Sequence, residues 1–327
     1  MSPLKKKRSL GQFYTTGNPF VLPAFRRWLD AAGPRPDEKI LEPFAGANHL
    51  VRLMREAGYH LPWACFDIAP SASAAEGFSI ERRDCLKRFP KGFRLAITNP
   101  PYLARNSATR RRLSFPDTPH DDLYKHAVAI CLKNVEYLAA IIPESFLTSG
   151  DLTGRLEAVV SLSFPMFDDT EHPVCLALFS PKQSQDFEIF LGDEHIGPHS
   201  AVAGFLPPPR RIHPWRFNDP EGSIGLRAVD NNSVPSIAFV RGESIPPGRV
   251  KQSSRALTRI AGLPGSVPQD AFLAAANALL KDYRSHTRDV LMTPFKGLRA
   301  DGYYRRRLDF STARHLMDLA LDSLPGS

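Results

Sequence analysis

Short apolar runs alternate with amphipathic segments over the first half of the chain. The runs contain β-branched residues and end at Pro, Gly or a carboxylate, which is typical of buried strands. Between them apolar residues recur at helical spacing, as Phe20, Ala24 and Trp28 do after a start at Asn18-Pro19. Strands that alternate with helices predict an α/β fold with a doubly wound sheet. We expect strands at residues 39–42, 63–67, 78–84, 93–98 and 136–143, and a short helix at 152–160.

From about Pro181 the pattern changes to short β-like runs separated by Pro and Gly, most clearly at 207–216. Two later segments, 270–283 and 311–324, have the apolar stripe of a helix. We therefore predict a smaller α+β region after the first domain. The expected divisions are a basic tail at 1–8, an α/β domain at 9–182 and a second region at 183–327.

The composition indicates a cytosolic protein with a polyanionic partner. The net charge is +8 and the pI is near 9.4, which suits nucleic acid although many basic proteins bind none. No apolar run reaches the ~18–20 residues of a membrane span, and the Lys-rich start lacks a secretory apolar region. The 4 cysteines are far apart without metal-type spacing, so we expect reduced core thiols and no metal.

The most informative stretch is 94–102, where an apolar strand stops at Asn99-Pro100-Pro101-Tyr102. Two prolines fix φ near about −65° and favour extended geometry before them. They hold an amide, a carbonyl and an aromatic ring at the carboxyl end of a strand, where open α/β sheets bind ligands. The tetrapeptide resembles motif IV of the S-adenosylmethionine-dependent N6-adenine methyltransferases, a motif shared with enzymes that methylate glutamine amides and RNA bases. The alternative is a Pro-Pro turn with an incidental Asn.

This resemblance implies catalytic roles for Asn99, Pro100 and Tyr102. The Asn99 side-chain oxygen and the Pro100 carbonyl each accept an N–H of the adenine amine, which favours a pyramidal nitrogen with its lone pair aimed at the methyl group. Tyr102 stacks on the base, a contact worth roughly 1–3 kcal/mol. Residues 121–134 and 136–146 resemble motifs V and VI, and 167–179 resembles motif VIII, in which Phe167 is the second stacking ring. A plain core role for Phe167 is the alternative, and His172 is a weaker candidate for the same place.

The strand–turn–helix at 39–50 resembles motif I, which binds the cofactor. Glu42 ends the strand, Phe44 fits the aromatic position of the family pattern, and Gly46 lets the backbone approach a ligand closely. Asn48 stands where the family has a second glycine, and we expect it to cap the following helix. The dinucleotide pattern Gly-x-Gly-x-x-Gly is absent.

Two further carboxylates follow predicted strands. The number of residues between the glycine turn and Asp67 is typical of a carboxylate at the end of the second strand that binds ribose hydroxyls. Ile68 is expected to cover one face of the cofactor adenine. Asp84 matches motif III, which accepts from the adenine amine of the cofactor. A single carboxylate of this kind is more often a solvated loop residue, but a series at successive strand ends favours a site.

The segment 11–16 resembles motif X, which helps to hold the methionine end of the cofactor, and Tyr14 and Thr15 are its candidate contacts. Thr16 replaces the usual proline. The segment comes before motif I in the chain, which is the motif order of the γ-type enzymes. The preceding basic run, Lys5 to Arg8, is either a solvated tail or an arm that contacts phosphates.

A long polar stretch with four arginines, at 103–120, follows the Asn-Pro-Pro-Tyr motif. Beside a base pocket these side chains suit phosphate contacts or a lid, and a solvated loop is the alternative. The candidate DNA-binding residues are Arg105, Arg110, Arg111 and Arg112.

Together these features predict a site-specific DNA (adenine-N6) methyltransferase with S-adenosylmethionine as cofactor. The family implies duplex DNA as the partner, a flipped target base, a possible cognate restriction endonuclease, and a bacterial, archaeal or phage-encoded protein of the cytoplasm. The second region is interpreted as target recognition, with a dimerisation or capping domain as the alternative. The other functional hypotheses are an RNA-base or protein-glutamine methyltransferase and a non-catalytic DNA-binding protein on the same scaffold.

Overall fold

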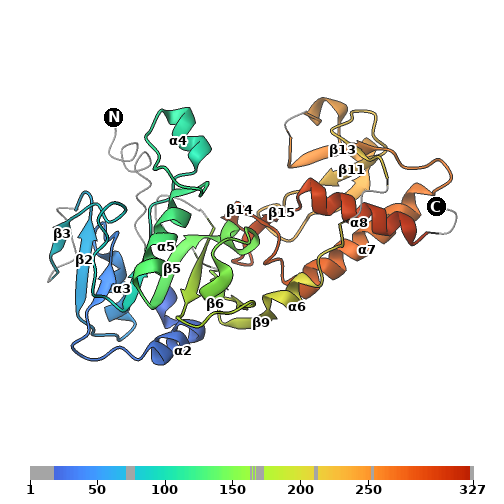
Figure 1. Ribbon diagram of the computed structural model, residues 1–327. Coiled ribbons are helices and arrows are strands. Elements are labelled where there is room, and N and C mark those ends of the chain that lie inside the picture. The colour runs from blue at the N-terminus through green and yellow to red at the C-terminus, as the bar shows by residue number, and fades with distance from the viewer. Residues whose placement is uncertain are drawn as a thin grey trace. The chain divides into compact units, whose positions relative to one another are not determined.

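The computed structural model describes residues 18–70, 78–162, 164, 166, 173–209, 213–251 and 254–324. The chain divides into two compact units, with the boundary between His199 and Ser200. Figure 1 shows the elements of both units in the order of the chain. Each unit has its own sheet and its own apolar core.

The described part of the first unit is built on a nine-stranded sheet in the order β3-β2-β1-β4-β5-β7-β6-β8-β9. Strands β1 to β5 run parallel, whereas β7 is antiparallel to both β5 and β6. The strands are β1 (Ile40–Glu42), β2 (Trp63–Asp67), β3 (Ile80–Arg82), β4 (Leu95–Thr98), β5 (Tyr137–Pro143), β6 (Leu156–Ser161), β7 (Val174–Phe179), β8 (Glu188–Leu191) and β9 (Glu194–Pro198).

The order of the parallel strands reverses between β1 and β4, because the chain passes outward to β3 before it returns to β4. This reversal is the switch point of a doubly wound sheet, and ligands bind outside the carboxyl ends of the strands there. The predicted doubly wound α/β fold is confirmed. Its first five strands lie where the apolar runs placed them.

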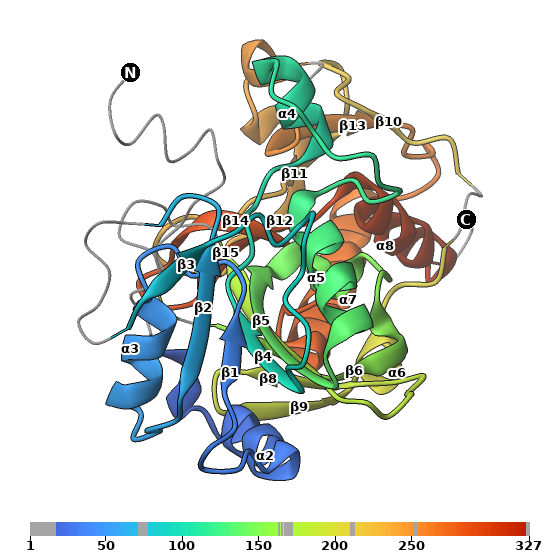
Figure 2. The ribbon, with the colours of Figure 1, turned by 60° about the vertical axis from the view of Figure 1, so that its left-hand side comes forward.

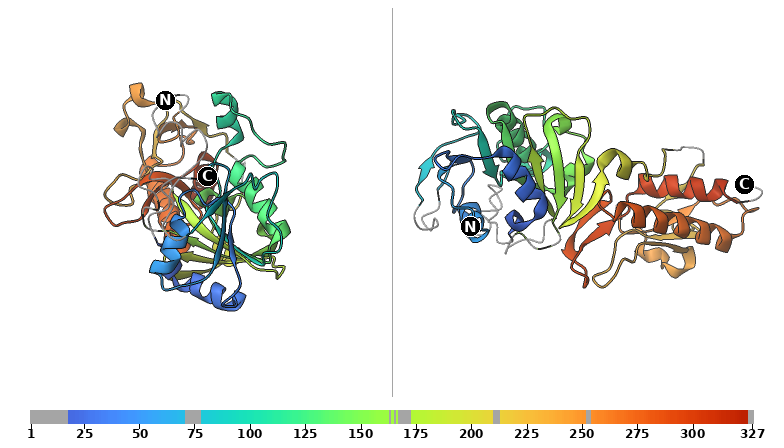
Figure 3. Two further views of the ribbon diagram at one scale, coloured as in Figure 1. Left: turned by 90° about the vertical axis from the view of Figure 1, so that its left-hand side faces the viewer. Right: turned by 90° about the horizontal axis from the view of Figure 1, so that it is seen from below.

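Helices cover both faces of this sheet (Figures 2 and 3). The helical elements are η1 (Pro19–Val21), α2 (Pro23–Ala32), α3 (His49–Glu56), α4 (Arg105–Arg111), α5 (Leu123–Asn134), η2 (Glu144–Thr148) and η3 (Thr153–Arg155). Helices α2 and α3 bury their apolar stripes in one core with the strands, and α5 lies on the opposite side of the sheet. Trp28 of α2 is fully buried and its indole N–H donates to the Phe179 carbonyl of β7 at 3.0 Å.

Two expectations for the end of the first unit were wrong. Residues 152–160 form η3 and the start of β6 and contain no α-helix, because their apolar residues fit a sheet position between β7 and β8. The predicted boundary at residue 182 falls too early, because β8 and β9 extend the first sheet to Pro198.

The second unit combines a four-stranded antiparallel sheet with a pair of helices and a hairpin. The sheet order is β10-β13-β11-β12. Helices α7 and α8 pack against each other and share a core with the sheet. The elements are β10 (Arg216–Phe217), β11 (Ile224–Arg227), β12 (Ala238–Arg241), η4 (Gly242–Ser244), η5 (Pro247–Arg249), β13 (Leu257–Ala261), α7 (Gln269–Thr287), β14 (Thr293–Leu298), β15 (Tyr304–Arg307) and α8 (Phe310–Asp322), and α6 (His199–Ala203) begins at the boundary.

A buried carboxylate, Asp230, organises the polar interior of the second unit. Arg284 donates to both of its oxygens at 3.0 Å, and Arg299 donates to Oδ2 at 3.0 Å. Burial opposes ionisation of Asp230, but the Arg284 hydrogen bond and the backbone N–H of Ser236 outweigh it, so its pKa lies below the ordinary value. Arg299 and Arg306, two basic residues of the region that was interpreted as target recognition, are both buried. Their role is therefore structural.

No helix among the described residues is both long and apolar enough to cross a bilayer.

Candidate active site

The carboxyl end of β1 carries a buried acid, Glu42, that is 1% exposed. Its Oε1 accepts hydrogen bonds from the Phe44 backbone N–H at 3.1 Å and from the Thr98 hydroxyl at 2.7 Å. No described residue is bonded to its Oε2. Burial raises the pKa of Glu42 to about 8, the two hydrogen bonds oppose this, and the charge of Asp67 adds to it. Glu42 is therefore largely a neutral acid at pH 7.

The turn after β1 is attached to β2 through Asp67. The carboxylate accepts from the Gly46 backbone N–H at 2.9 Å and from the Ala69 N–H at 2.7 Å. Gly46 has φ 55°, a left-handed conformation that glycine adopts without strain. The structure thus places Glu42, Gly46 and Asp67 at one edge of the sheet. Ile68, directly after Asp67, is 56% exposed.

Asn48 begins α3 in a left-handed conformation, with φ 59°. The expectation that its side chain caps the helix is wrong, because it makes no capping hydrogen bond. The side chain is 1% exposed, and neither its oxygen nor its nitrogen has a partner among the described residues. A buried amide without partners costs about 1–3 kcal/mol per group. Such a group in a ligand-type turn suggests that a bound molecule completes its hydrogen bonds.

Asp84 follows β3 at the same edge but is more open. Its Oδ1 accepts from the Leu86 N–H at 3.2 Å, and its Oδ2 lies 3.6 Å from the Lys87 ammonium nitrogen. The neighbouring Arg83 N–H donates to the Asp67 carbonyl at 2.8 Å, so the ends of β2 and β3 are held together. The two carboxylates therefore follow adjacent strands, as predicted from the sequence.

The Asn99-Pro100-Pro101-Tyr102 motif follows β4 directly. The Tyr102 hydroxyl lies 2.6 Å from Asn99 Oδ1 and 2.7 Å from the Ile141 carbonyl oxygen. Burial raises the pKa of this phenol well above its ordinary value, so the hydroxyl keeps its proton. The ring packs edge-on to Tyr124 of α5, with centroids 6.2 Å apart. No described residue donates a hydrogen bond to the Pro100 carbonyl.

The arginine-rich segment after this motif contains the helix α4, where sequence analysis expected an irregular loop. The helix buries Ala108 and ends at Arg112, which is left-handed with φ 55°. Figures 1 and 2 show α4 projecting from the rest of the first unit. Ala108 is the one residue of this polar helix that is buried.

Of the four arginines, Arg105 faces the protein. Its guanidinium donates to the His120 carbonyl at 2.7 Å and to the Thr118 carbonyl, and it lies 4.6 Å from the centroid of the Phe115 ring. These contacts hold the segment together, and the predicted phosphate contact of Arg105 stays a prediction. The other three, Arg110, Arg111 and Arg112, are exposed.

Several predicted site residues cannot be placed. Tyr14, Thr15, Phe167 and His172 lie outside the described residues. Within the described ranges, no group of His, Cys, Asp and Glu side chains has the arrangement of a metal site.

Sequence analysis missed two parts of the site. Thr98 links the β4 end to Glu42, and the Ile141 carbonyl of β5 holds Tyr102. No motif singles out either residue. The available signal for both residues was that β4 lies between β1 and β5 in the sheet, because the ends of adjacent strands bring such groups together.

No protein-family model matches this chain, and no curated protein sequence matches it. Similar solved structures include a type I restriction-modification methyltransferase subunit from Streptococcus thermophilus, with 14% identity, a TM-score of 0.40, and coverage of 54% of this chain and 46% of that one. The M protein of the type I restriction enzyme EcoKI shows 15% identity and a TM-score of 0.39 over 85% of this chain and 72% of its own. The 23S rRNA methyltransferase ErmE shows 16% identity and a TM-score of 0.32 over 51% and 69%.

These similarities are weak, and this chain matches less than half the length of the Streptococcus subunit. The function of the chain is therefore inferred from its own residues.

Proposed function

We propose that this protein transfers a methyl group from S-adenosylmethionine to the N6 amine of an adenine in DNA. The observation that carries the proposal is the 2.7 Å hydrogen bond from Thr98 to Glu42. It joins the residue immediately before Asn99 to the acid that ends β1, across the switch point of the sheet. The amine-orienting motif and the cofactor turn are thus neighbours, as direct transfer between two bound molecules requires.

The described residues fit the proposed cofactor. Glu42 Oε2 and the Asn48 amide are buried polar groups without partners among the described residues, and both belong to the same turn. Asp67 has lone pairs left for ribose hydroxyls, Asp84 is open enough to accept from an adenine amine, and exposed Ile68 can cover the ring. Tyr14 and Thr15 are proposed for the methionine end. When bound, the cofactor supplies an electrophilic methyl group on a sulfonium.

The protein's own part in the reaction is to orient the amine. The Asn99 side-chain oxygen and the Pro100 carbonyl are the proposed acceptors for its two N–H groups. Asn99 Oδ1 can accept from Tyr102 and from the amine together, because an amide oxygen has two lone pairs. The bond to Tyr102 fixes the direction of this oxygen before the base arrives. Catalysis is therefore mostly positioning and electrostatics.

DNA is the proposed acceptor because the exposed arginines of α4 follow the Asn-Pro-Pro-Tyr motif closely in the chain. Arg110, Arg111 and Arg112 give this helix a cationic end suited to phosphates. The target adenine has to leave the stack, since its amine is not accessible inside a duplex. Phe167 is proposed as the second ring against the flipped base, and a cognate restriction endonuclease is a proposed partner.

The test is methyl transfer from labelled S-adenosylmethionine to unmethylated duplex DNA, followed by nucleoside analysis. We expect label in N6-methyladenine, and a loss of at least about a hundredfold in Asn99→Ala. Asn134→Ala, at an exposed amide at the end of α5, is the matched control and should keep full activity. Label in cytosine would refute the base assignment. If DNA takes no label, RNA and protein are offered in its place, and label in RNA or in glutamine would identify the alternative acceptor. A protein that binds DNA but not the cofactor would be a non-catalytic scaffold.

A further inference from the structure

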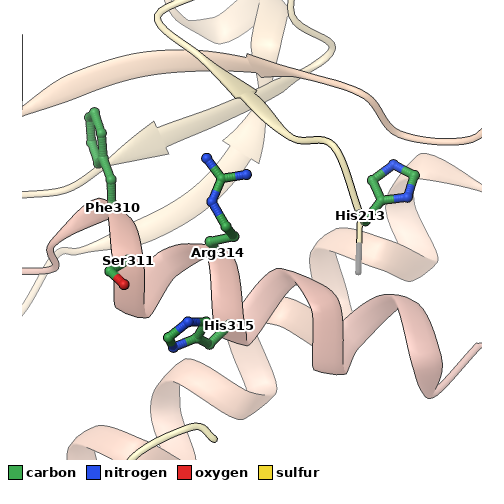
Figure 4. A pocket seen from close by; sticks show the side chains of 5 residues that line it. All are labelled: His213, Phe310, Ser311, Arg314 and His315. Atoms are coloured by element: carbon green, nitrogen blue, oxygen red, sulfur yellow. The ribbon is translucent and has the colours of Figure 1, made fainter. Parts of the chain in front are cut away.

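The second unit contains a pocket over the first turns of α8, far along the chain from the residues of the candidate active site. Its volume is about 430 Å³, and it opens to solvent. It is lined by His213, Phe310, Ser311, Arg314 and His315 (Figure 4). The lining therefore combines a guanidinium, two imidazoles and a hydroxyl with one aromatic ring, and contains no carboxylate.

Arg314 is held in place by contacts that leave its charge uncompensated. One guanidinium nitrogen donates to the Trp215 carbonyl at 2.9 Å, and the group lies 5.1 Å from the centroid of the Phe217 ring. Phe217 in turn stacks on Phe310, with centroids 4.6 Å apart. No carboxylate of the described residues forms an ion pair with Arg314. In Figure 4 its side chain stands between Phe310 and His213.

The two carboxylates that flank Arg314 most closely in the sequence form hydrogen bonds with other residues. Asp309 caps the helix and accepts from the Thr312 N–H at 2.9 Å and from its hydroxyl at 2.8 Å. Asp318 is 1% exposed and accepts from the Trp215 indole N–H at 2.6 Å. The pocket thus keeps a positive charge at the amino end of a helix, where the helix dipole also favours an anion.

Of the other lining groups, Ser311 and His315 can donate hydrogen bonds to a ligand. His213 contacts the Gly262 carbonyl through Nε2, and because a carbonyl only accepts, this nitrogen carries a proton. The imidazole is fixed by that bond and by Trp215, whose ring centroid is 4.4 Å away. Ser311 and His315 lie one turn apart on α8. A fixed guanidinium beside a hydroxyl donor and one imidazole donor, that of His315, is an arrangement that recognises phosphate oxygens.

We propose that this pocket binds a phosphate group, with Arg314 as its cation and Ser311 as a neutral donor. The source is either the backbone of a nucleic acid or a free nucleotide, and the preference for the backbone rests on the proposed function. As a backbone contact the pocket would position nucleic acid without reading its sequence.

The experiment measures binding alone, so it does not depend on methyl transfer. Duplex DNA affinity is determined over a range of salt concentrations for the wild type, Arg314→Gln and Arg227→Gln, which removes an exposed arginine of β11. For a backbone contact we expect Arg314→Gln to weaken binding about tenfold and to lower the salt slope by about one. Arg227→Gln should leave both unchanged. Equal slopes and affinities for all three proteins exclude the backbone source.

A second arm tests the free ligand. Inorganic phosphate and adenosine monophosphate are each titrated while the melting temperature of the full chain is recorded. Protection of the wild type that Arg314→Gln and Ser311→Ala both lose supports the pocket with a nucleotide source. The proposal is overturned if folded Arg314→Gln behaves as the wild type in both arms. Should Arg314→Gln fail to fold, Ser311→Ala and His315→Gln decide by the same criteria. Asn99→Ala should keep the wild-type salt slope, which separates this result from failure of the proposed catalysis.

Discussion

The hydroxyl of Tyr102 lies 2.6 Å from the side-chain oxygen of Asn99 and 2.7 Å from the Ile141 carbonyl oxygen. One proton serves two acceptors, so the phenol bridges the Asn-Pro-Pro-Tyr turn and the neighbouring strand β5. Sequence analysis gave Tyr102 a stacking role only. The structure adds a positioning role, because the hydroxyl determines where the amide oxygen points.

The two roles of Tyr102 can be separated by substitution. Tyr102→Phe keeps the ring and removes the hydroxyl, so we expect kcat to fall about tenfold while KM for DNA changes little. Tyr102→Ala should also raise KM, since it removes base stacking worth about 1–3 kcal/mol. Steady-state methyl transfer distinguishes these effects. Tyr137→Phe, whose hydroxyl has only a 3.5 Å contact with the Ala31 carbonyl, is the control. Wild-type kinetics in Tyr102→Phe would refute the positioning role.

Glu42 predicts a pH dependence of stability. Its pKa rises from 4.5 to about 8 on folding because it is buried, so the native state binds the extra proton between these values. Stability should therefore fall as pH rises through this window and level off above about pH 8. Glu42→Gln cannot lose a proton, and its melting temperature should fall less between pH 6 and pH 9. Identical pH profiles for the two proteins would contradict a buried neutral acid.

Asp67 should govern cofactor affinity. Asp67→Asn replaces one acceptor oxygen with a donor, which disrupts the bond to Gly46 or the proposed contact with ribose. We expect cofactor binding, measured by calorimetry, to weaken at least about tenfold. Asp37→Asn makes the same chemical change at an exposed position and should have no effect. Unchanged affinity in Asp67→Asn would remove this residue from the cofactor site.

The arginines of α4 should divide into two classes. Arg110→Gln combined with Arg112→Gln should weaken DNA binding and lower its salt slope, with cofactor binding unchanged. Arg105→Gln should instead loosen the segment, because its guanidinium holds the carbonyls of Thr118 and His120. Limited proteolysis between 105 and 120 measures that loosening. Faster cleavage in the Arg110→Gln, Arg112→Gln double variant than in Arg105→Gln would show that Arg105 is not the residue that holds the segment together.

Asp230 should be important for the stability of the second unit. Asp230→Asn removes a fully buried anion that pairs with both Arg284 and Arg299, and Asp289 is then the carboxylate that still pairs with both, so we expect a loss of about 3–5 kcal/mol in the free energy of unfolding. Asp301→Asn breaks the ion pair with Arg299, in which the Asp301 side chain is 39% exposed. This change should lower the free energy of unfolding by about 0–1 kcal/mol. Urea unfolding followed by circular dichroism compares them. A similar loss in both variants would contradict the central role of Asp230.

Sequence analysis located the strand ends because each is marked locally. Apolar runs that stop at Glu42, Asp67 and Asn99 predicted β1, β2 and β4, and the switch point follows from their alternation with helices. Features that depend on distant partners were not predictable. Residues 156–161 form a strand because β7 and β8 lie on either side. Buried Arg299 pairs with the nearby Asp301, but also with Asp230, which is far away in the sequence.

The β8–β9 hairpin has a consequence for anyone who wishes to produce the first unit alone. A fragment that ends at residue 182 would lose both strands and leave β6 with a row of unpaired backbone N–H and C=O groups. Open apolar edges of this kind recruit other chains and lead to aggregation. The natural edge strand, β9, carries Glu194, His195 and Pro198, and charge and proline discourage such pairing. A fragment that ends at residue 199 should therefore remain monodisperse where the shorter one precipitates.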